Sequence, residues 1–135
     1  MISNDSILEQ LQVLVHNAGL DGWLFYDFRG LNPFPAQLLK LNEGILTRRW
    51  FLYLPASGQP TLVHHRIEST TWQQLLQDQT VAFKDFASHE PMDAQLRATL
   101  RGAKRIAMEF SPFGEVPYVG FVDAGTVQRI NTALA

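Results

Sequence analysis

The sequence predicts an α/β fold in which helices cover both faces of a mixed sheet. Stretches with the composition of strands alternate with stretches of helical periodicity along most of the 135 residues. Two strand candidates, 46–54 and 61–65, flank the turn-forming segment PASGQP, which is typical of an antiparallel hairpin with a longer loop. This hairpin makes the predicted sheet mixed, since the other connections pass through helices.

The first third of the chain contains two predicted helices around one predicted strand. Apolar side chains recur at offsets of three and four residues over 5–18, which predicts a helix, and Gly19 is well placed to end it. The apolar and aromatic run 22–28 predicts the first strand. A short helix is expected over about 35–41. The hairpin strands then follow.

The second half of the chain continues the alternation. We expect, in chain order, a helix over 67–78, a weak strand over 80–86, a helix over 90–101 and a strand over 105–110. The apolar stretch 116–124, opened by Pro117, predicts a buried helix, and the segment TVQRI at 126–130 predicts a last short strand. No repeat and no linker divides the chain, so residues 1–135 are expected to form a single domain.

The composition excludes several classes of function. Hydrophobic residues make up 46% and charged residues 18%, which is typical of a globular protein. The net charge is −2 and no cluster of lysine and arginine occurs, so we expect no nucleic-acid partner. Cysteine is absent, which excludes disulfides and thiolate catalysis. No signal peptide and no apolar run of about 20 residues are found, so we expect a cytoplasmic protein without a membrane partner.

The strongest candidate for a metal site is the pair His64 and His65, with Glu68 three residues on. A metal ion needs several ligands that converge on one point. Neighbouring residues on a strand point to opposite faces, and no further carboxylates cluster beside this pair. We therefore expect no metal site in this chain. We expect one histidine at a helix-sheet contact and the other in solvent, with His65 and Glu68 shaping the turn that leads into the next helix.

Asp27 and Arg29 lie at the end of the first predicted strand, and Glu109 lies near the end of the strand at 105–110. Ligands of open α/β sheets gather beyond the carboxyl ends of strands, and a guanidinium matches a carboxylate with two hydrogen bonds. The structural alternative is an ion pair of Arg29 with Asp27 or with Glu109, and we favour it because structural ion pairs also cluster at strand ends. No nucleophile with a matching base and no phosphate-binding loop is found.

Three segments resemble a known family. They are DGWLFYDFRGLNP, LTRRWFLYLPASGQPTLVHHRIE and AMEFSPFGEVPYVGFVDAGTV. Together they are similar, in order and spacing, to the N-terminal domain of creatinase/prolidase proteins, which include Xaa-Pro aminopeptidases and Xaa-Pro dipeptidases. The resemblance implies a three-layer α/β/α domain with a mixed sheet of roughly five to six strands, related to the ribonuclease H-like motif.

The resemblance also implies a division of labour. In this family a C-terminal "pita-bread" domain, absent from this chain, holds two divalent metal ions (Mn, Co or Zn) on two aspartates, two glutamates and a histidine. No residue of this chain matches those ligands, so none is expected to be catalytic and no cofactor is expected here. The N-terminal domain of relatives builds homo-oligomer contacts and walls the substrate entrance. In creatinase-like relatives one of its arginines contacts the substrate carboxylate, and Arg29 is the candidate for that role.

Three functions are left open. The first is a non-catalytic domain of a metal-dependent Xaa-Pro peptidase, whose partner is the catalytic domain. The second is a free-standing module of the same fold that binds a small ligand, such as a carboxylate near Arg29, or a protein. The third is a small metalloenzyme that uses His64 or His65, which has the sparse set of ligands described above.

Overall fold

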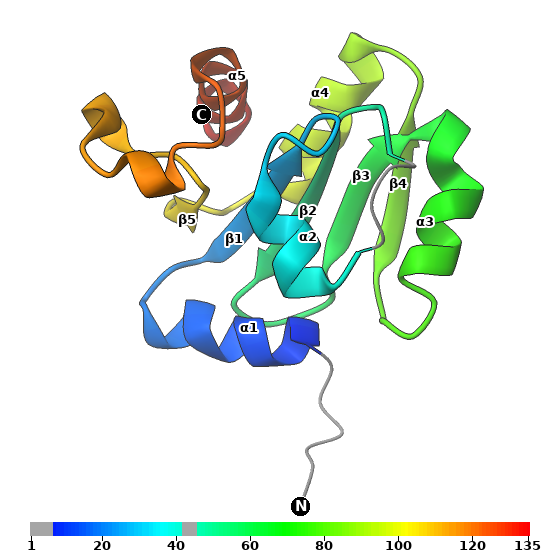
Figure 1. Ribbon diagram of the computed structural model, residues 1–135, viewed down its shortest axis with the longest axis horizontal. Coiled ribbons are helices and arrows are strands. Elements are labelled where there is room, and N and C mark those ends of the chain that lie inside the picture. The colour runs from blue at the N-terminus through cyan, green and yellow to red at the C-terminus, as the bar shows by residue number, and fades with distance from the viewer. Residues whose placement is uncertain (1–6, 42–45) are drawn as a thin grey trace, which may run out of the picture.

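The protein is a three-layer α/β/α sandwich. The computed structural model describes residues 7–41 and 46–135, and within them it confirms the predicted fold class with a mixed sheet of five strands (Figure 1). The strands are β1 (Gly22–Asp27), β2 (Trp50–Pro55), β3 (Thr61–His65), β4 (Ala82–Phe86) and β5 (Ile106–Ala107). The helices are α1 (Ile7–Asn17), α2 (Pro33–Leu39), α3 (Ser69–Leu75), α4 (His89–Thr99) and α5 (Ala124–Leu134).

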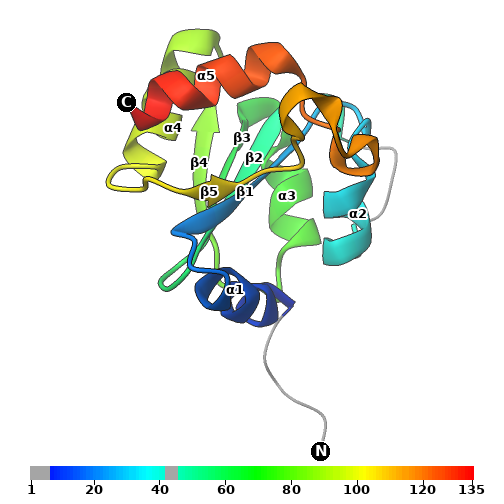
Figure 2. The same cartoon turned by 90° about the vertical axis from the view of Figure 1, so that its left-hand side faces the viewer.

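The sheet has the strand order β4-β3-β2-β1-β5. β1 and β2 run antiparallel, and β2 and β3 form the predicted hairpin. β4 joins β3 in parallel and β5 joins β1 in parallel, each after a helical connection. The chain therefore starts its sheet near one edge, crosses to the other, and returns through α4 to add β5 beside β1, as Figure 2 shows.

The two central strands are buried on both faces, and their alternate side chains build two separate cores. Phe25, Leu52 and Leu54 point to the face that α1, α2 and α3 cover. Leu24 and Phe51, one residue along, point to the face that α4 and α5 cover. Because side chains of a strand alternate between faces, a continuous apolar run is what a sheet covered on both sides requires.

The carboxyl-terminal prediction was wrong. The segment 116–124 is not a buried helix: it is a mostly exposed connection with a short 3₁₀ turn at Pro117–Val119, and a similar turn at Pro112–Gly114 precedes it. The predicted strand 126–130 lies inside α5. Asp123 caps the N-terminus of this helix, because its side chain accepts a hydrogen bond from the Thr126 amide at 2.9 Å. TVQRI contains three β-branched residues, which are common in strands, but Thr126 and Ile130 are four residues apart and are buried on one helical face.

Other differences concern element ends. The strand predicted over 46–54 begins only at Trp50, and the one predicted over 105–110 is paired over two residues. The short helix predicted from residue 35 begins at Pro33, because Asn32 caps it. None of the described helices has the length and apolar character needed to cross a membrane.

Candidate functional site

The turn that follows β1 is organised by Asp27. Its carboxylate accepts a hydrogen bond from the Gly30 amide and another from the Asn32 amide, both at 2.8 Å. Asp27 is buried, and Leu31 adds a backbone bond to the carbonyl of Phe28 at 3.2 Å. The polar run that follows the buried strand is therefore a tight turn closed by a side chain.

This turn holds Arg29 in an unusual backbone conformation. Its φ of +59° lies in the left-handed region, and Gly30 follows with a φ of +76°. A non-glycine residue there is uncommon, and such strain is often found at functional sites. The Arg29 side chain is exposed, with its guanidinium 5.9 Å from the centre of the Phe28 ring. Among the described residues, Arg29 forms no ion pair with Asp27 or Glu109, so neither predicted pair is present.

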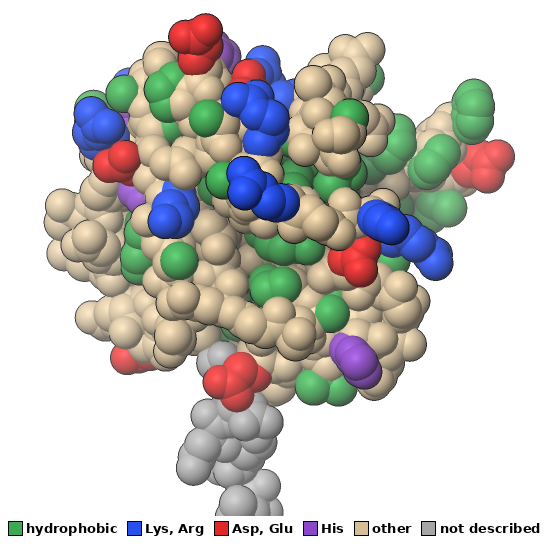
Figure 3. Space-filling view, turned by 180° about the vertical axis from the view of Figure 1, so that it is seen from behind, with side chains coloured by type: hydrophobic (Ala, Val, Ile, Leu, Met, Phe, Trp, Pro, Cys, Tyr) green, Lys and Arg blue, Asp and Glu red, His purple; other side chains and the backbone are tan. Residues whose placement is uncertain are grey.

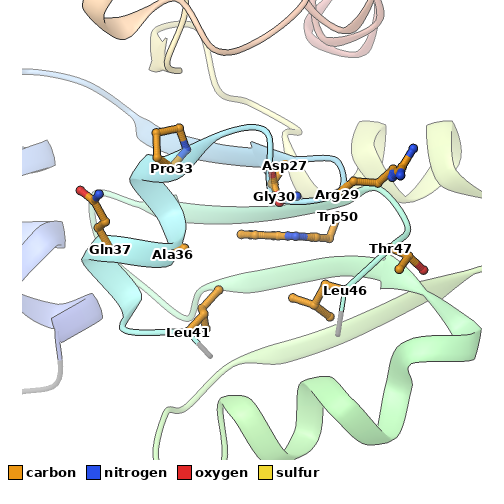
Figure 4. A pocket seen from close by; sticks show the side chains of 10 residues that line it. All are labelled: Asp27, Arg29, Gly30, Pro33, Ala36, Gln37, Leu41, Leu46, Thr47 and Trp50. Atoms are coloured by element: carbon orange, nitrogen blue, oxygen red, sulfur yellow. Dashed lines mark hydrogen bonds between the residues drawn. The ribbon is translucent and has the colours of Figure 1, made fainter. Parts of the chain in front are cut away.

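A cavity of about 500 Å³ opens beside this turn (Figure 4). Asp27, Arg29 and Gly30 line one side, and residues of α2 and of the segment before β2 line the others. In Figure 4 the indole of Trp50 lies across the cavity, and the Arg29 side chain extends outward from the rim. The lining of the cavity is therefore mixed: Leu41, Leu46 and Trp50 are apolar, whereas Asp27 is acidic. Arg29 is the cationic side chain at its mouth, where it can bind an anionic group of a small molecule.

Glu109 belongs to a separate, buried hydrogen-bond network. One carboxylate oxygen accepts from Trp23 Nε1 at 2.8 Å and the other accepts from Asn32 Nδ2 at 2.7 Å. Glu109 is only 4% exposed, and this burial raises the pKa of its carboxyl, partly offset by the two hydrogen bonds. The network ties the end of β5 to the β1 turn, because Asn32 also bonds Asp27.

Asn32 is the residue that sequence reasoning missed. Its side-chain amide donates to the Tyr26 carbonyl at 2.8 Å and to Glu109, while its side-chain oxygen accepts from the Phe34 amide at 3.1 Å. The dipeptide Asn32-Pro33 was the available signal, since asparagine favours the N-cap and proline the first helical position. Its bond to Glu109 spans 77 positions and has no local signal.

The histidine pair has structural surroundings. His64 is buried, and its Nδ1 donates to the carbonyl of His65 at 2.9 Å. His65 is half-buried, and its Nδ1 accepts from the Ile67 amide at 3.1 Å, which caps the 3₁₀ turn Arg66–Glu68. Glu68 is buried and accepts from the Thr47 amide at 2.8 Å. These residues join the end of β3 to α3 and to the segment before β2.

The described residues do not form a cluster that could hold a metal ion. Across residues 7–41 and 46–135, no three side chains of histidine, aspartate or glutamate come close enough together to share a metal ion. The two-metal site that the resemblance assigns to a second domain therefore has no counterpart in the described part of this one.

The comparisons with solved structures identify the fold. Dipeptidase PepE from Mycobacterium ulcerans superposes with a TM-score of 0.70 at 22% identity, over 95% of this chain and 31% of that chain. The creatinase/prolidase N-terminal domain of an X-Pro dipeptidase from Streptococcus pyogenes gives a TM-score of 0.65 at 17% identity, over 94% of this chain and 92% of that chain. A proline dipeptidase from Streptococcus pneumoniae gives a TM-score of 0.68 at 17% identity, over 96% of this chain and 86% of that chain.

These matches confirm the resemblance at the level of the fold, which is that of the creatinase/prolidase N-terminal domain. The chain spans about a third of the length of the Mycobacterium ulcerans dipeptidase. No protein-family model matches the sequence, and no curated protein matches it.

Proposed function

We propose that this chain is the non-catalytic N-terminal domain of a metal-dependent Xaa-Pro peptidase. The likeness to N-terminal domains of Xaa-Pro dipeptidases supports this role. In this proposal the partner is a catalytic domain that carries two divalent ions (Mn, Co or Zn), and the protein acts in the cytoplasm. The domain by itself does not hydrolyse peptides, because it contributes no ligand to those ions.

The proposed task of Arg29 is to face the substrate. The observation that carries this assignment is the left-handed backbone of Arg29 at an exposed turn that Asp27 holds closed. The guanidinium has no carboxylate partner among the described residues, so its donors are free to bind the substrate carboxylate with two parallel hydrogen bonds. Arg29 would thus form part of the wall of the substrate entrance.

The proposed second task is oligomerisation. We name residues 110–121 the apolar arm. Five large apolar side chains are exposed on it: Phe110, Phe113, Val116, Tyr118 and Phe121. Figure 3 shows green side chains on this arm, which projects at the upper right of that view. Exposed apolar patches of this kind often mark protein interfaces.

An alternative is a free-standing module of the same fold that binds a small ligand or a protein. The cavity of about 500 Å³ beside Arg29 favours this alternative, because Arg29 at its rim can bind a small carboxylate and Leu41, Leu46 and Trp50 offer apolar contacts inside it. The reading frame after Ala135 discriminates between the two. The peptidase proposal expects it to encode two aspartates, two glutamates and a histidine in the order of the metal ligands.

The first experiment measures hydrolysis of Xaa-Pro dipeptides by residues 1–135 with manganese or cobalt. We expect no turnover. Turnover that copurifies with the chain and disappears with a chelator would contradict the proposal.

The second experiment uses the whole protein that the continued reading frame encodes. Arg29→Ala should raise KM about ten- to a hundredfold with kcat nearly unchanged, because a charge-assisted hydrogen bond contributes about 1.5–3 kcal/mol. Arg101→Ala is the matched control, since Arg101 is also exposed but lies after α4. An unchanged KM in the Arg29 variant would remove Arg29 from the substrate site.

A further inference from the structure

A second cavity, of about 420 Å³, lies between α1 and β5, and we name it the α1–β5 cleft. Its lining includes Leu14 and Ala18 of α1, Trp23 of β1, Met108 after β5, and Val119 of the apolar arm. Figure 2 shows α1 below β5, with the connection to α5 passing above. Nearly all of the described lining is apolar, and Glu109 is the single charged residue among it.

Among the described residues, Glu109 has no positively charged partner. Its carboxylate accepts hydrogen bonds from the Trp23 indole and from the Asn32 side-chain amide, and both of these donors are neutral. The salt bridges found among the described residues join Arg66 to Asp85 and Arg129 to Asp93, and neither involves Glu109. A carboxylate that is 4% exposed without a cation is costly, and this cost is what makes a charged partner favourable. Each carboxylate oxygen has a further lone pair that can accept a hydrogen bond.

We propose that the α1–β5 cleft binds a small apolar amine, with the ammonium group against Glu109 and the hydrocarbon body between α1 and Met108. The choice of ligand follows from charge complementarity. An anion would be repelled by Glu109, and a neutral apolar molecule would leave the carboxylate without a counter-charge. An ammonium group supplies both the charge and hydrogen-bond donors. This site does not involve Arg29 or a catalytic domain, so it goes beyond the proposed function.

The proposal predicts a pH dependence of binding. The amine pairs with the ionised carboxylate, and burial raises the pKa of Glu109, so affinity should fall as the pH is lowered. Asp27, at the end of β1, is the titratable group that the hydrogen bonds of Asn32 link to Glu109. The described lining from α1, α2, β5 and the apolar arm adds no other titratable group.

The test is isothermal titration calorimetry of residues 1–135 at pH 5 and pH 8 with 2-phenylethylamine. The matched probes are 2-phenylethanol, which is neutral, and 3-phenylpropionate, which is anionic. We expect one site for the amine, at least tenfold weaker binding of the alcohol, no binding of the acid, and weaker amine binding at pH 5. Equal affinities for amine and alcohol, or no binding of the amine at millimolar concentration, would overturn the proposal.

Two variants locate the site. Glu109→Gln should remove the preference for the amine over the alcohol, whereas Glu115→Gln, at an exposed position on the apolar arm, should keep it. Val119 is half-buried and lines the cleft, so the larger side chain of Val119→Trp should fill it. This variant should abolish binding of both the amine and the alcohol. This second variant leaves the Glu109 network intact, so it decides the matter if Glu109→Gln does not fold. Amine binding that is unchanged by Val119→Trp would place the ligand elsewhere and overturn the proposal.

Discussion

At the scale of single residues, Asn32 connects the end of β1, the start of α2 and the buried Glu109. It caps α2, bonds the Tyr26 carbonyl, supports the Asp27 turn through its own amide, and reaches Glu109. A buried side chain with this many partners is costly to remove, because each partner is then left without a hydrogen bond. The position of Arg29 depends on the same turn, so Asn32 supports the proposed substrate contact indirectly.

The first prediction concerns the stability that Asn32 provides. Asn32→Ala should lower the free energy of unfolding by about 2–4 kcal/mol, because it removes a helix cap and leaves buried groups unpaired. Asn131→Ala, on the exposed face of α5, is the control and should change it by less than about 0.5 kcal/mol. Urea denaturation checks both, and equal stability of the two variants would refute this role of Asn32.

The second prediction concerns the charge on Glu109. Burial raises the pKa of its carboxyl in the folded state, so the folded state holds the proton more tightly than the unfolded state does. Its contribution to stability is therefore fully present below about pH 4.3, the usual glutamate value, and is lost as the pH rises through the raised pKa. The free energy of unfolding of the wild type minus that of Glu109→Gln should decrease over this window. Urea titrations of both proteins at several pH values measure it, and a difference that grows with pH would contradict the prediction.

At the scale of elements, α5 shows how a local signal can mislead. The segment 126–130 was predicted as a strand, but the Asp123 side chain accepts hydrogen bonds from both the amide and the hydroxyl of Thr126, at 2.9 and 2.7 Å. These bonds start a helix whose buried residues pack on α4 and the sheet. The two 3₁₀ turns before α5 have no side-chain cap, and most residues of 112–121 are exposed. This segment therefore stays an exposed connection.

The third prediction tests the cap of α5. Asp123→Ala should lower the free energy of unfolding by about 1 kcal/mol, because two groups of the first turn lose their acceptor. Asp123→Ser keeps a hydroxyl acceptor at the cap and should recover most of that loss. Thermal and urea unfolding of both variants measure the effect. An Asp123→Ala protein as stable as the wild type would show that packing alone specifies this helix.

At the scale of the whole molecule, the two cores use nearly all the large apolar side chains of the sheet, and the apolar arm is left outside them. Phe113 is 99% exposed and Tyr118 is 83% exposed, so folding of the described chain gains little from either. Their placement is instead consistent with burial against another protein surface, which is the basis of the proposed oligomerisation.

The fourth prediction concerns the oligomeric state of residues 1–135. Residues 1–135 should sediment as a dimer or a larger species, and the double variant Phe113→Ser with Tyr118→Ser should sediment as a monomer with unchanged stability. Ile67→Ser is the control, because Ile67 is 69% exposed but lies beside α3, away from the arm. Analytical ultracentrifugation over a range of concentrations measures the masses. A wild-type monomer at every concentration would count against the oligomerisation role.

The sequence by itself determined the alternation of strands and helices, the hairpin of β2 and β3, and the end of the first strand near Asp27 and Arg29. These features depend on residues that are neighbours in the sequence, because apolar periodicity and turn-forming residues act over a few positions. The resemblance of three segments was sufficient to anticipate the fold that the solved structures share.

Only the tertiary structure decided which of the polar residues meet. Glu109 binds Trp23 across 86 positions and Asn32 across 77, and Arg29 binds neither Asp27 nor Glu109. These contacts exist because β5 adds beside β1 in the sheet, and strand order is set by the packing of whole elements. The α1–β5 cleft and the exposed apolar arm follow from the same packing, since local periodicity does not record which surfaces are left uncovered.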